Sequence, residues 1–347
     1  MKMQHEVTQK QPLLDTRGHI TEEGWARRPV WQYDRAAIKS SAIRIKEWDY
    51  YAIISHEHHL ACCLTFSDLG YAGLFAIALV DLARKDVRQC DSLKIAPLGK
   101  LGLAADSGDY TVSYSNRSLR IALSRKGDRR RILFGAPDLL LANGERGIDG
   151  DITLIQPETL ESLNIATSWE KKRTAFYLNE KINCLAASGT LHLGKETVTL
   201  HPHESFGVLD WGRGRWTYTN RWYWASASGM VNDHLFGFNL GYGFSDRSTA
   251  SENALIYDRK IHKLDEVTFE IPSDWSHQSW KITSNDHRCE LTFTPTADRQ
   301  SHMNYLLIKT DQVQVFGYYH GTVVLDDGTE LTIHDFPGFA EDVYNRY

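Results

Sequence analysis

Short runs of apolar, β-branched and aromatic residues recur along most of the chain, and clusters of Gly, Pro, Asp, Asn and Ser separate them. Runs of this length are typical of β-strands, and the clusters between them are typical of turns. The first half of the chain therefore predicts a meander or barrel. Its strands are expected at residues 50–54, 60–66, 73–82, 110–114 and 119–124.

The second half repeats this rhythm. Asp327-Gly328 lies between two apolar runs and predicts a hairpin, because Asp-Gly readily adopts the positive φ angles of tight turns. A short helix or helical turn is expected only at 137–141 and within 160–169. Strands are expected at 190–193, 197–200, 216–227, 235–244, 253–257, 260–264, 267–271, 280–284, 289–295, 305–310, 312–319 and 330–336.

The length of the chain, 347 residues, exceeds the size at which a single hydrophobic core usually stops growing. Two packed units are therefore expected. Residues 1–40 mix turn formers with charges and predict an extended N-terminal arm, which two β domains follow at 41–170 and 171–347. The predicted fold class is all-β, with two antiparallel β-barrels or half-barrels in tandem.

The 10 Trp, 16 Tyr and 13 Phe residues strengthen the β assignment and indicate aromatic-lined cavities. A net charge of -5 provides no basic field for phosphate groups, so nucleic acid is not expected as a partner. No apolar run is long enough to span a membrane, and the N-terminus lacks the apolar stretch of a secretory signal. The five cysteines have no metal-binding spacing, and their odd number does not form a complete set of disulfide pairs. They are therefore expected to be reduced. These features together predict a soluble, cytoplasmic protein.

The segment 209–229 carries the residues of greatest chemical interest. If 216–224 is one strand, its alternation places one set of side chains on a single face: Trp216, Tyr218, Asn220, Trp222 and Trp224. This aromatic face either fills a sandwich core or lines a ligand cavity. The sequence leaves both interpretations open.

The segment 236–244 alternates strictly between large apolar residues and a face formed by Gly237, Asn239, Gly241 and Gly243. Glycine on one face of a strand permits close approach of a ligand or of another backbone. The spacing differs from the dinucleotide-binding pattern, and the chain has no Walker, HExxH or nucleophile-elbow motif. No cofactor is expected.

Asp210 precedes two arginines, Arg213 and Arg215, and Gly212 and Gly214 are expected to supply a tight bend beside it. A structural ion pair between carboxylate and guanidinium is one interpretation. The other makes Asp210 an acid or base at the rim of a cavity. A neighbouring arginine opposes an acid role, because it stabilises the ionised carboxylate.

Two histidine clusters have the alternating spacing of metal ligands: His56, His58 and His59 in the first, His201 and His203 in the second. Both lie where the apolar pattern breaks, so solvated turns are the expected setting. The sequence does not decide whether either cluster binds a metal. Further polar candidates are Glu252, Asn253 and His320.

Several motifs of the chain resemble, in the same order, those of one bacterial family known only as a domain of unknown function. They are Gly24-Trp25-Ala26-Arg27-Arg28-Pro29, Lys46-Glu47-Trp48-Asp49-Tyr50-Tyr51, Asp68-Leu69-Gly70-Tyr71-Ala72-Gly73, Lys181-Ile182-Asn183-Cys184, Leu209-Asp210-Trp211-Gly212-Arg213-Gly214 and Ser251-Glu252-Asn253-Ala254. More distantly, the layout resembles the tandem lipocalin-like superfamily that includes carotenoid hydratases, tocopherol cyclases and fungal pericyclases. That resemblance implies an elongated apolar substrate held at or between two β-barrel halves.

The expected function is binding of a hydrophobic or amphipathic small molecule in a pocket of the C-terminal barrel, with acid-catalysed hydration, cyclisation or isomerisation as the candidate chemistry. Asp210 is the candidate acid. A non-catalytic carrier or chaperone for lipophilic molecules is one alternative, and a carbohydrate-binding protein with an open aromatic platform is another. The expected ligand-binding residues are Trp216, Tyr218, Trp222, Trp224, Asn239, Glu252, Asn253 and Arg213.

Overall fold

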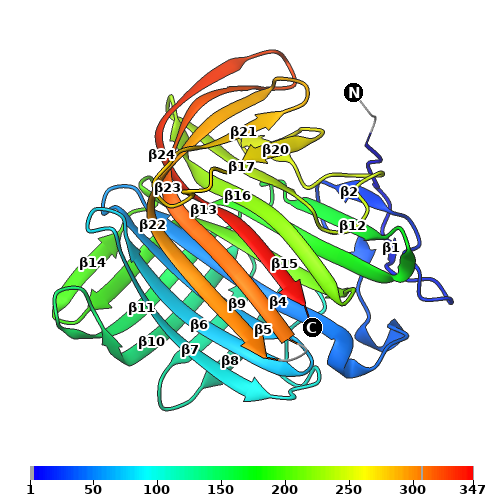
Figure 1. Ribbon diagram of the computed structural model, residues 1–347, viewed down its shortest axis with the longest axis horizontal. Helices are drawn as coiled ribbons and strands as arrows, with labels where there is room; N and C mark the ends of the chain where they lie inside the picture. The colour runs from blue at the N-terminus through cyan, green and yellow to red at the C-terminus, as the bar shows by residue number, and fades with distance from the viewer. Residues whose placement is uncertain (1–3, 306–307, 347) are drawn as a thin grey trace.

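The computed structural model describes residues 4–305 and 308–346, and its elements are almost all β-strands. In that part of the chain the helical elements are two 3-10 turns, η1 (Arg35–Ala37) and η2 (Ala42–Arg44). None of the described helices is long and apolar enough to cross a membrane. Two curled antiparallel half-barrel sheets follow one another along the chain, so the predicted all-β fold with two antiparallel half-barrels in tandem is confirmed (Figure 1).

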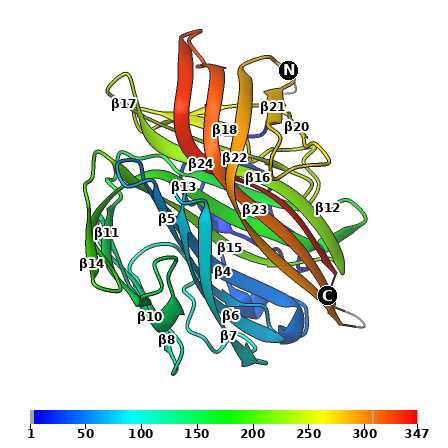
Figure 2. The ribbon, with the colours of Figure 1, turned by 60° about the vertical axis from the view of Figure 1, so that its left-hand side comes forward.

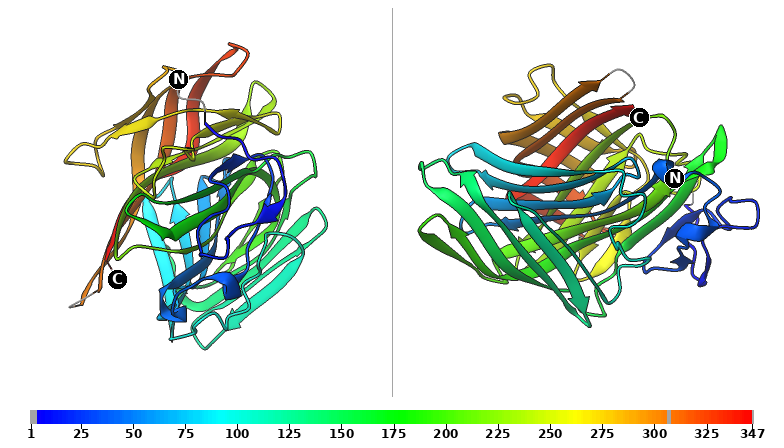
Figure 3. Two further views of the ribbon diagram at one scale, coloured as in Figure 1. Left: turned by 90° about the vertical axis from the view of Figure 1, so that its right-hand side faces the viewer. Right: turned by 90° about the horizontal axis from the view of Figure 1, so that it is seen from below.

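The first sheet has 13 strands and curls so that the two ends of its strand order, β4 to β7 and β8 to β11, form opposite walls (Figure 3, right). Its main path runs β7-β6-β5-β4-β15-β13-β11-β10-β9-β8, and β2, β12 and β14 pair off this path. The strands are β2 (Gly24–Ala26), β4 (Ile45–Ser55), β5 (Leu60–Asp68), β6 (Ala72–Asp81), β7 (Asp86–Ile95), β8 (Tyr110–Ser115), β9 (Arg120–Lys126), β10 (Arg129–Leu140), β11 (Arg146–Ile155), β12 (Leu163–Trp169), β13 (Lys172–Leu193), β14 (Glu196–Leu200) and β15 (Ser205–Arg215).

The second sheet has nine strands in the order β19-β18-β17-β16-β24-β23-β22-β21-β20, and its strands β22 to β24 lie against the first sheet (Figures 1 and 2). A separate pair, β1 (Gln11–Pro12) and β3 (Trp31–Gln32), belongs to the N-terminal segment. The nine strands are β16 (Thr219–Val231), β17 (His234–Tyr242), β18 (Ala254–Tyr257), β19 (Lys260–Lys263), β20 (Val267–Glu270), β21 (Trp280–Ser284), β22 (Cys289–Tyr305), β23 (Ile308–Val324) and β24 (Glu330–Arg346).

A layer of buried side chains joins the two sheets. Along β4, Tyr50, Ala52 and Ile54 belong to this layer, whereas Tyr51 and Ile53 point into the first sheet's own core. The second sheet supplies its side of the layer in the same way, from alternate positions of its strands. Both faces of β4 are therefore buried, which explains why its sequence is apolar without alternation from Tyr50 to Ile54.

A β-bulge in β13 forms a polar joint between the sheets. The register of β13 against β15 shifts between Ile182 and Leu185, and Cys184 has a φ of 61°. At this point the Asn183 side-chain amide donates hydrogen bonds to Ser226 Oγ (2.8 Å) and to the carbonyl oxygen of Phe238 (3.0 Å). The bulge thus turns a side chain of the first sheet into the second, as bulges commonly do.

Gly237 of β17 makes this joint possible. A Cβ atom at Gly237 would lie only 2.6 Å from Cys184 Sγ. The glycine face of 236–244 was expected to permit close approach of a ligand or of another backbone. At Gly237 it is β13 that approaches, at Cys184.

Several predicted elements are confirmed, and two are wrong. The Asp327-Gly328 turn joins β23 to β24, and Gly328 has a φ of 87°. The segments 137–141 and 160–169, expected to contain helix, contribute instead to β10 and β12. Ladder hydrogen bonds from neighbouring strands outweigh local helix preference there.

The two sheets divide the chain between residues 215 and 219, so β13 to β15 belong to the first sheet. The sequence placed those residues in a domain spanning 171–347. The N-terminal segment lies against the first sheet, where β2 pairs with β12. The domain limits at 40 and 170 themselves stay predictions.

We predict that Asn183→Ala lowers the free energy of unfolding by about 1–3 kcal/mol, because the substitution removes two buried hydrogen bonds and leaves their acceptors unsatisfied. Urea denaturation followed by tryptophan fluorescence measures this loss. Asn143→Ala, in the exposed β10–β11 turn, is the control and should cost much less. Equal losses for the two variants would contradict a special role for the joint.

Candidate functional site

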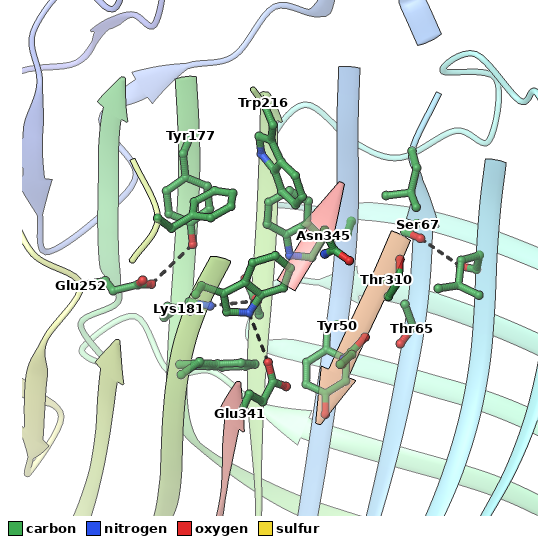
Figure 4. A pocket seen from close by; sticks show the side chains of 18 of the residues that line it. Tyr50, Thr65, Ser67, Tyr177, Lys181, Trp216, Glu252, Thr310, Glu341 and Asn345 are labelled. Carbon is green, nitrogen blue, oxygen red and sulfur yellow. Dashed lines mark hydrogen bonds and ion pairs between the residues drawn. The ribbon is translucent and has the colours of Figure 1, made fainter. Parts of the chain in front are cut away.

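A pocket of about 220 Å³ lies in the layer between the sheets. The sequence placed a pocket within the C-terminal barrel, whereas this one is lined from both sheets (Figure 4). The first sheet contributes Trp48, Tyr50, Tyr177, Lys181 and Asp210, among others. The second sheet contributes Trp222, Trp224, Arg299 and Glu341, among others.

Aromatic rings form one wall of the pocket. Trp48 stacks against Tyr177 with ring centroids 6.1 Å apart and meets Trp216 edge to face at 5.2 Å. Phe244 packs edge to face against Trp216 and Trp222, at 4.8 and 5.5 Å. Edge-to-face contacts of this kind hold the rings in fixed orientations.

Gly212 allows Trp48 to lie flat on β15. A Cβ atom at Gly212 would lie 1.9 Å from the Trp48 ring. Gly212 and Gly214 both lie inside the regular strand β15, and neither has a positive φ. The tight bend expected at these glycines is therefore wrong, and their role is to make room for rings above the strand.

A buried ion pair forms the floor of the pocket. Lys181 Nζ lies 2.9 Å from Asp210 Oδ2 and 3.8 Å from the centre of the Trp224 ring. The Asn179 amide donates to the other oxygen of Asp210 at 2.5 Å. Lys181 and Asp210 face each other because β13 and β15 pair with these two residues in register.

Glu341 of β24 projects into the pocket beside this ion pair (Figure 4). Its Oε1 accepts a hydrogen bond from the Gln314 amide at 2.6 Å, and its Oε2 lies 3.4 Å from Trp222 Nε1. Burial raises the pKa of Glu341 to about 7, although Lys181 and the Trp222 hydrogen bond oppose the shift. This carboxyl group can therefore hold or release a proton near neutral pH.

Glu252 is a second buried carboxyl group on the opposite side of Lys181 (Figure 4). Burial raises the pKa of Glu252, and the Lys181 ammonium only partly offsets this effect. The Tyr177 hydroxyl donates to Glu252 Oε2 at 3.5 Å. The pocket thus holds three carboxyl groups around one lysine.

Most of the predicted site residues gather at this pocket. Asp210, Trp216, Trp222, Trp224 and Glu252 line it directly. Two others stand behind the lining and support it. Asn239 Oδ1 accepts the Trp224 indole N–H at 2.7 Å, and Asn253 Oδ1 accepts the backbone N–H of Gly241 at 2.7 Å.

Arg213 and Tyr218 lie elsewhere. Arg213 is fully buried on the other face of β15, where it pairs with Asp49 at 3.1 Å. Tyr218 is 44% exposed in the turn between β15 and β16, because the expected single strand over 216–227 begins only at Thr219. Asp210 pairs with Lys181 and not with an arginine.

The sequence interpretation missed Lys181, Glu341, Trp48 and Tyr177. The sequence offered a signal for Glu341, whose charge directly follows the apolar pair Phe339-Ala340, whereas Lys181 lies among other polar residues, Asn179, Glu180 and Asn183. The resemblance motifs did contain Lys181 and Trp48, but nothing in them assigned a role. No spacing in the sequence connects these residues, since they meet only when the sheets pack.

The two histidine clusters do not assemble into a metal-binding group within the described residues. His56 is half-buried and contacts the Ser228 carbonyl oxygen at 3.0 Å, and His201 contacts Glu57 at 2.8 Å. The group of possible ligands that the described chain does contain is His320, His334 and Asp335, on β23 and β24, with two of the three exposed. These residues lie outside the pocket lining.

We predict that Lys181→Met lowers the free energy of unfolding by about 3–5 kcal/mol, because it leaves the Asp210 carboxylate buried without its counter-ion. The double variant Lys181→Met with Asp210→Asn should regain much of this loss, since neither partner then carries a charge. Chemical denaturation of the three variants, each single and the double, measures the coupling. Additive effects would contradict the ion pair.

We predict that Gly212→Ala costs about 1–3 kcal/mol of stability, because the new methyl group displaces the Trp48 ring. The same substitution made in a Trp48→Ala background should cost much less. A double-mutant cycle by chemical denaturation measures the difference. A cost unchanged by removal of the Trp48 ring would contradict the contact.

Comparison with solved structures supports the fold. A provisionally named AttH protein of Nitrosomonas europaea has a TM-score of 0.54 at 14% identity, with 86% of this chain and 92% of that chain covered. CghA in complex with Sch210972 gives 0.48 at 12% identity, covering 88% and 89%. Kievitone hydratase from Nectria haematococca gives 0.45 at 12% identity, covering 86% and 88%.

No curated protein matches the chain in sequence. The chain does match the model of one protein family. The pattern of the family described as Domain of unknown function (DUF2804) matches residues 4–347, so the protein belongs to this family.

Proposed function

We propose that the protein binds a hydrophobic or amphipathic small molecule between its two sheets and catalyses its hydration, cyclisation or isomerisation without a cofactor. The observation that carries the proposal is Glu341: a buried carboxyl group with a pKa of about 7, aimed into an aromatic-walled pocket. A general acid works best when its pKa lies near the operating pH. Perturbed carboxyl groups in a pocket are typical of functional sites.

The chemistry proposed is proton transfer to a carbon–carbon double bond. The Glu341 O–H gives its proton to one alkene carbon, and the other carbon becomes a carbocation. The faces of Trp222 and Trp224 and the neighbouring carboxylate stabilise this positive charge. Water, or a hydroxyl group or double bond of the same molecule, then attacks the cation, and the proton released returns to a carboxylate.

Asp210 was the acid expected from the sequence, and the ion pair gives it a different part in the proposal. Both oxygens of Asp210 already face donors, Lys181 Nζ at 2.9 Å and the Asn179 amide at 2.5 Å, so neither is placed to give a proton to a ligand. We therefore assign proton donation to Glu341. Asp210 keeps Lys181 in place and contributes negative charge near the cation.

The alternatives remain distinguishable. A lipid carrier needs an apolar cavity but no buried acid, whereas this pocket holds Glu252 and Glu341 together with an ion pair. A sugar-binding platform needs exposed rings, whereas Trp224 is 4% exposed and Trp222 is partly buried. Both observations favour an enclosed, reactive site. A cytoplasmic location belongs to the same proposal, because five cysteines outside any disulfide suit a reducing compartment.

The test begins with the ligand that copurifies with the protein, identified by native mass spectrometry and organic extraction. With that compound as substrate, Glu341→Gln should lower kcat by about 10²–10⁴, the typical contribution of a general acid. The wild-type rate should fall as the pH rises through about 7, because Glu341 then loses the proton that it donates. Glu330→Gln, an exposed position of the same strand, is the matched control.

Full turnover by Glu341→Gln would overturn the assignment of the acid. Tight binding without turnover by the wild-type protein would favour the carrier instead. Asp210→Asn distinguishes the two carboxyl groups, since it removes charge beside the cation but leaves the proton donor intact. It should therefore lower kcat and move the alkaline limb of the pH profile to lower pH, because the Asp210 charge helps to raise the pKa of Glu341, whereas Glu341→Gln should abolish this limb.

A further inference from the structure

We infer that the ligand of this pocket is an organic anion of the carboxylic acid class, whose charged group binds Arg299 while its apolar body lies along the aromatic wall. The inference rests on the proposed function, because it concerns the same pocket, and it names the class of molecule that enters. The observation behind it is a balance of charges in which one cation of the lining lacks a counter-ion.

The other lining cation, Lys181, is neutralised by Asp210 at 2.9 Å. Arg299 makes no such pair: among the described residues no carboxylate lies within ion-pairing distance of its guanidinium group. Burial favours the protonated, uncharged forms of Glu252 and Glu341. Arg299 has no counter-ion of its own, so the carboxylate of a bound monoanion would neutralise its charge.

Arg299 is held in place by amide groups that leave part of its donor capacity unused. Its Nε donates to Gln89 of the first sheet, and its Nη1 donates to Gln314 Oε1 at 3.3 Å. A guanidinium group has five N–H donors in a fixed, planar fork that matches a carboxylate. The side chain is thus anchored across the gap between the sheets, with donors remaining for a ligand.

The strand register places Arg299 close to the proposed acid. Arg299 pairs with Gln314, and Gln314 pairs with Glu341, so the three residues lie side by side on one face of the second sheet. The Gln314 side chain contacts both of its neighbours, because it accepts from Arg299 and donates to Glu341. Polar lining residues continue along the same face toward the strand ends: Thr310, Gln312 and Asn345.

This arrangement gives the ligand a direction. The carboxylate lies at Arg299, where amide and hydroxyl groups surround it, and the apolar part extends toward Trp222, Trp224 and the ion pair. The ligand carboxylate at Arg299 also makes ionisation of Glu341 less favourable. Binding of the anion therefore keeps Glu341 protonated and able to donate. Neutral ligands of the same shape would lack this effect.

The affinity for an anion should therefore fall as the pH rises through about 7, since ionised Glu341 repels it. The charged and titratable groups that surround this carboxyl come from every neighbouring element of the pocket. They are Tyr50 of β4, Cys63 of β5, Lys181 of β13, Asp210 of β15, Glu252 of the segment before β18 and Arg299 of β22.

The experiment compares matched pairs of a carboxylic acid and the corresponding primary alcohol, titrated into the full-length protein by isothermal calorimetry at pH 6 and pH 8. The probes are geranic acid with geraniol, cinnamic acid with cinnamyl alcohol, and decanoic acid with decanol. At least one acid should bind at pH 6 about tenfold or more tightly than its alcohol. Its affinity should decrease at pH 8.

Arg299→Gln should weaken binding of that acid by about tenfold to hundredfold and leave the alcohol unaffected, whereas Arg299→Lys should restore part of the loss. Arg131→Gln, an exposed arginine of β10, is the matched control. Circular dichroism and the unchanged affinity for the alcohol show that the Arg299 variants are folded.

Equal affinity for acid and alcohol, no binding by any of the acids, or an acid preference that survives Arg299→Gln would each overturn the inference. The proposed function fails differently. If Glu341→Gln retains turnover of the copurified compound while Arg299→Gln abolishes the preference for acids, the anion site stands and the acid assignment falls. If the wild-type protein shows no preference for acids but Glu341→Gln is inactive, the acid assignment stands and the anion site falls.

Discussion

The packing of the two sheets against each other is the constraint on which the rest of the structure depends. Each sheet already has a core on one face, so the strands between them must bury both faces. Small residues such as Ala52 and Ala78 allow close packing over part of this layer. Where large rings and charged side chains take their place, the sheets cannot close on each other, and the pocket occupies the remaining space.

Burial in that layer gives the polar residues their chemistry. In water, Glu341 would be an ordinary ionised carboxylate, and Lys181 would be a mobile ammonium group. Between the sheets the ion pair with Asp210 fixes Lys181, while Gln314 and Trp222 orient Glu341. The same low-polarity surroundings that make these groups costly to bury also strengthen their electrostatic interactions. The site is preorganised because a misplaced charge there would destabilise the fold.

The fold class follows from the sequence because strand length and turn residues are local signals, and most strands of the second sheet lie where the pattern places them. The central strands β13 and β15 were harder to identify. Both of their faces are buried, so the apolar and polar alternation that marks a strand is absent, and Gly212 and Gly214 suggested a bend. Gly212 makes room for the Trp48 ring, which is a contact between strands that local patterns do not encode.

The candidate site was predictable only in part, for a related reason. The aromatic residues Trp222 and Trp224 and the polar Glu252 stood out in their own segments. Lys181 and Glu341 did not, because their importance comes from partners 27 and more residues away that only the sheet registers bring close. A buried charge can be recognised in a sequence as an interruption of an apolar run, but its counter-ion cannot.

The bulge at Cys184 interrupts the pairing of β13 with β15, and there the Asn183 side chain bonds to the second sheet. It therefore acts as the pivot about which one sheet is oriented on the other. Because the pocket is the gap between those sheets, a small rotation about this pivot would change its width along the whole aromatic wall. The range of ligand shapes that the protein accepts can consequently evolve through substitutions at the pivot, whose residues Asn183 and Cys184 lie outside the pocket lining.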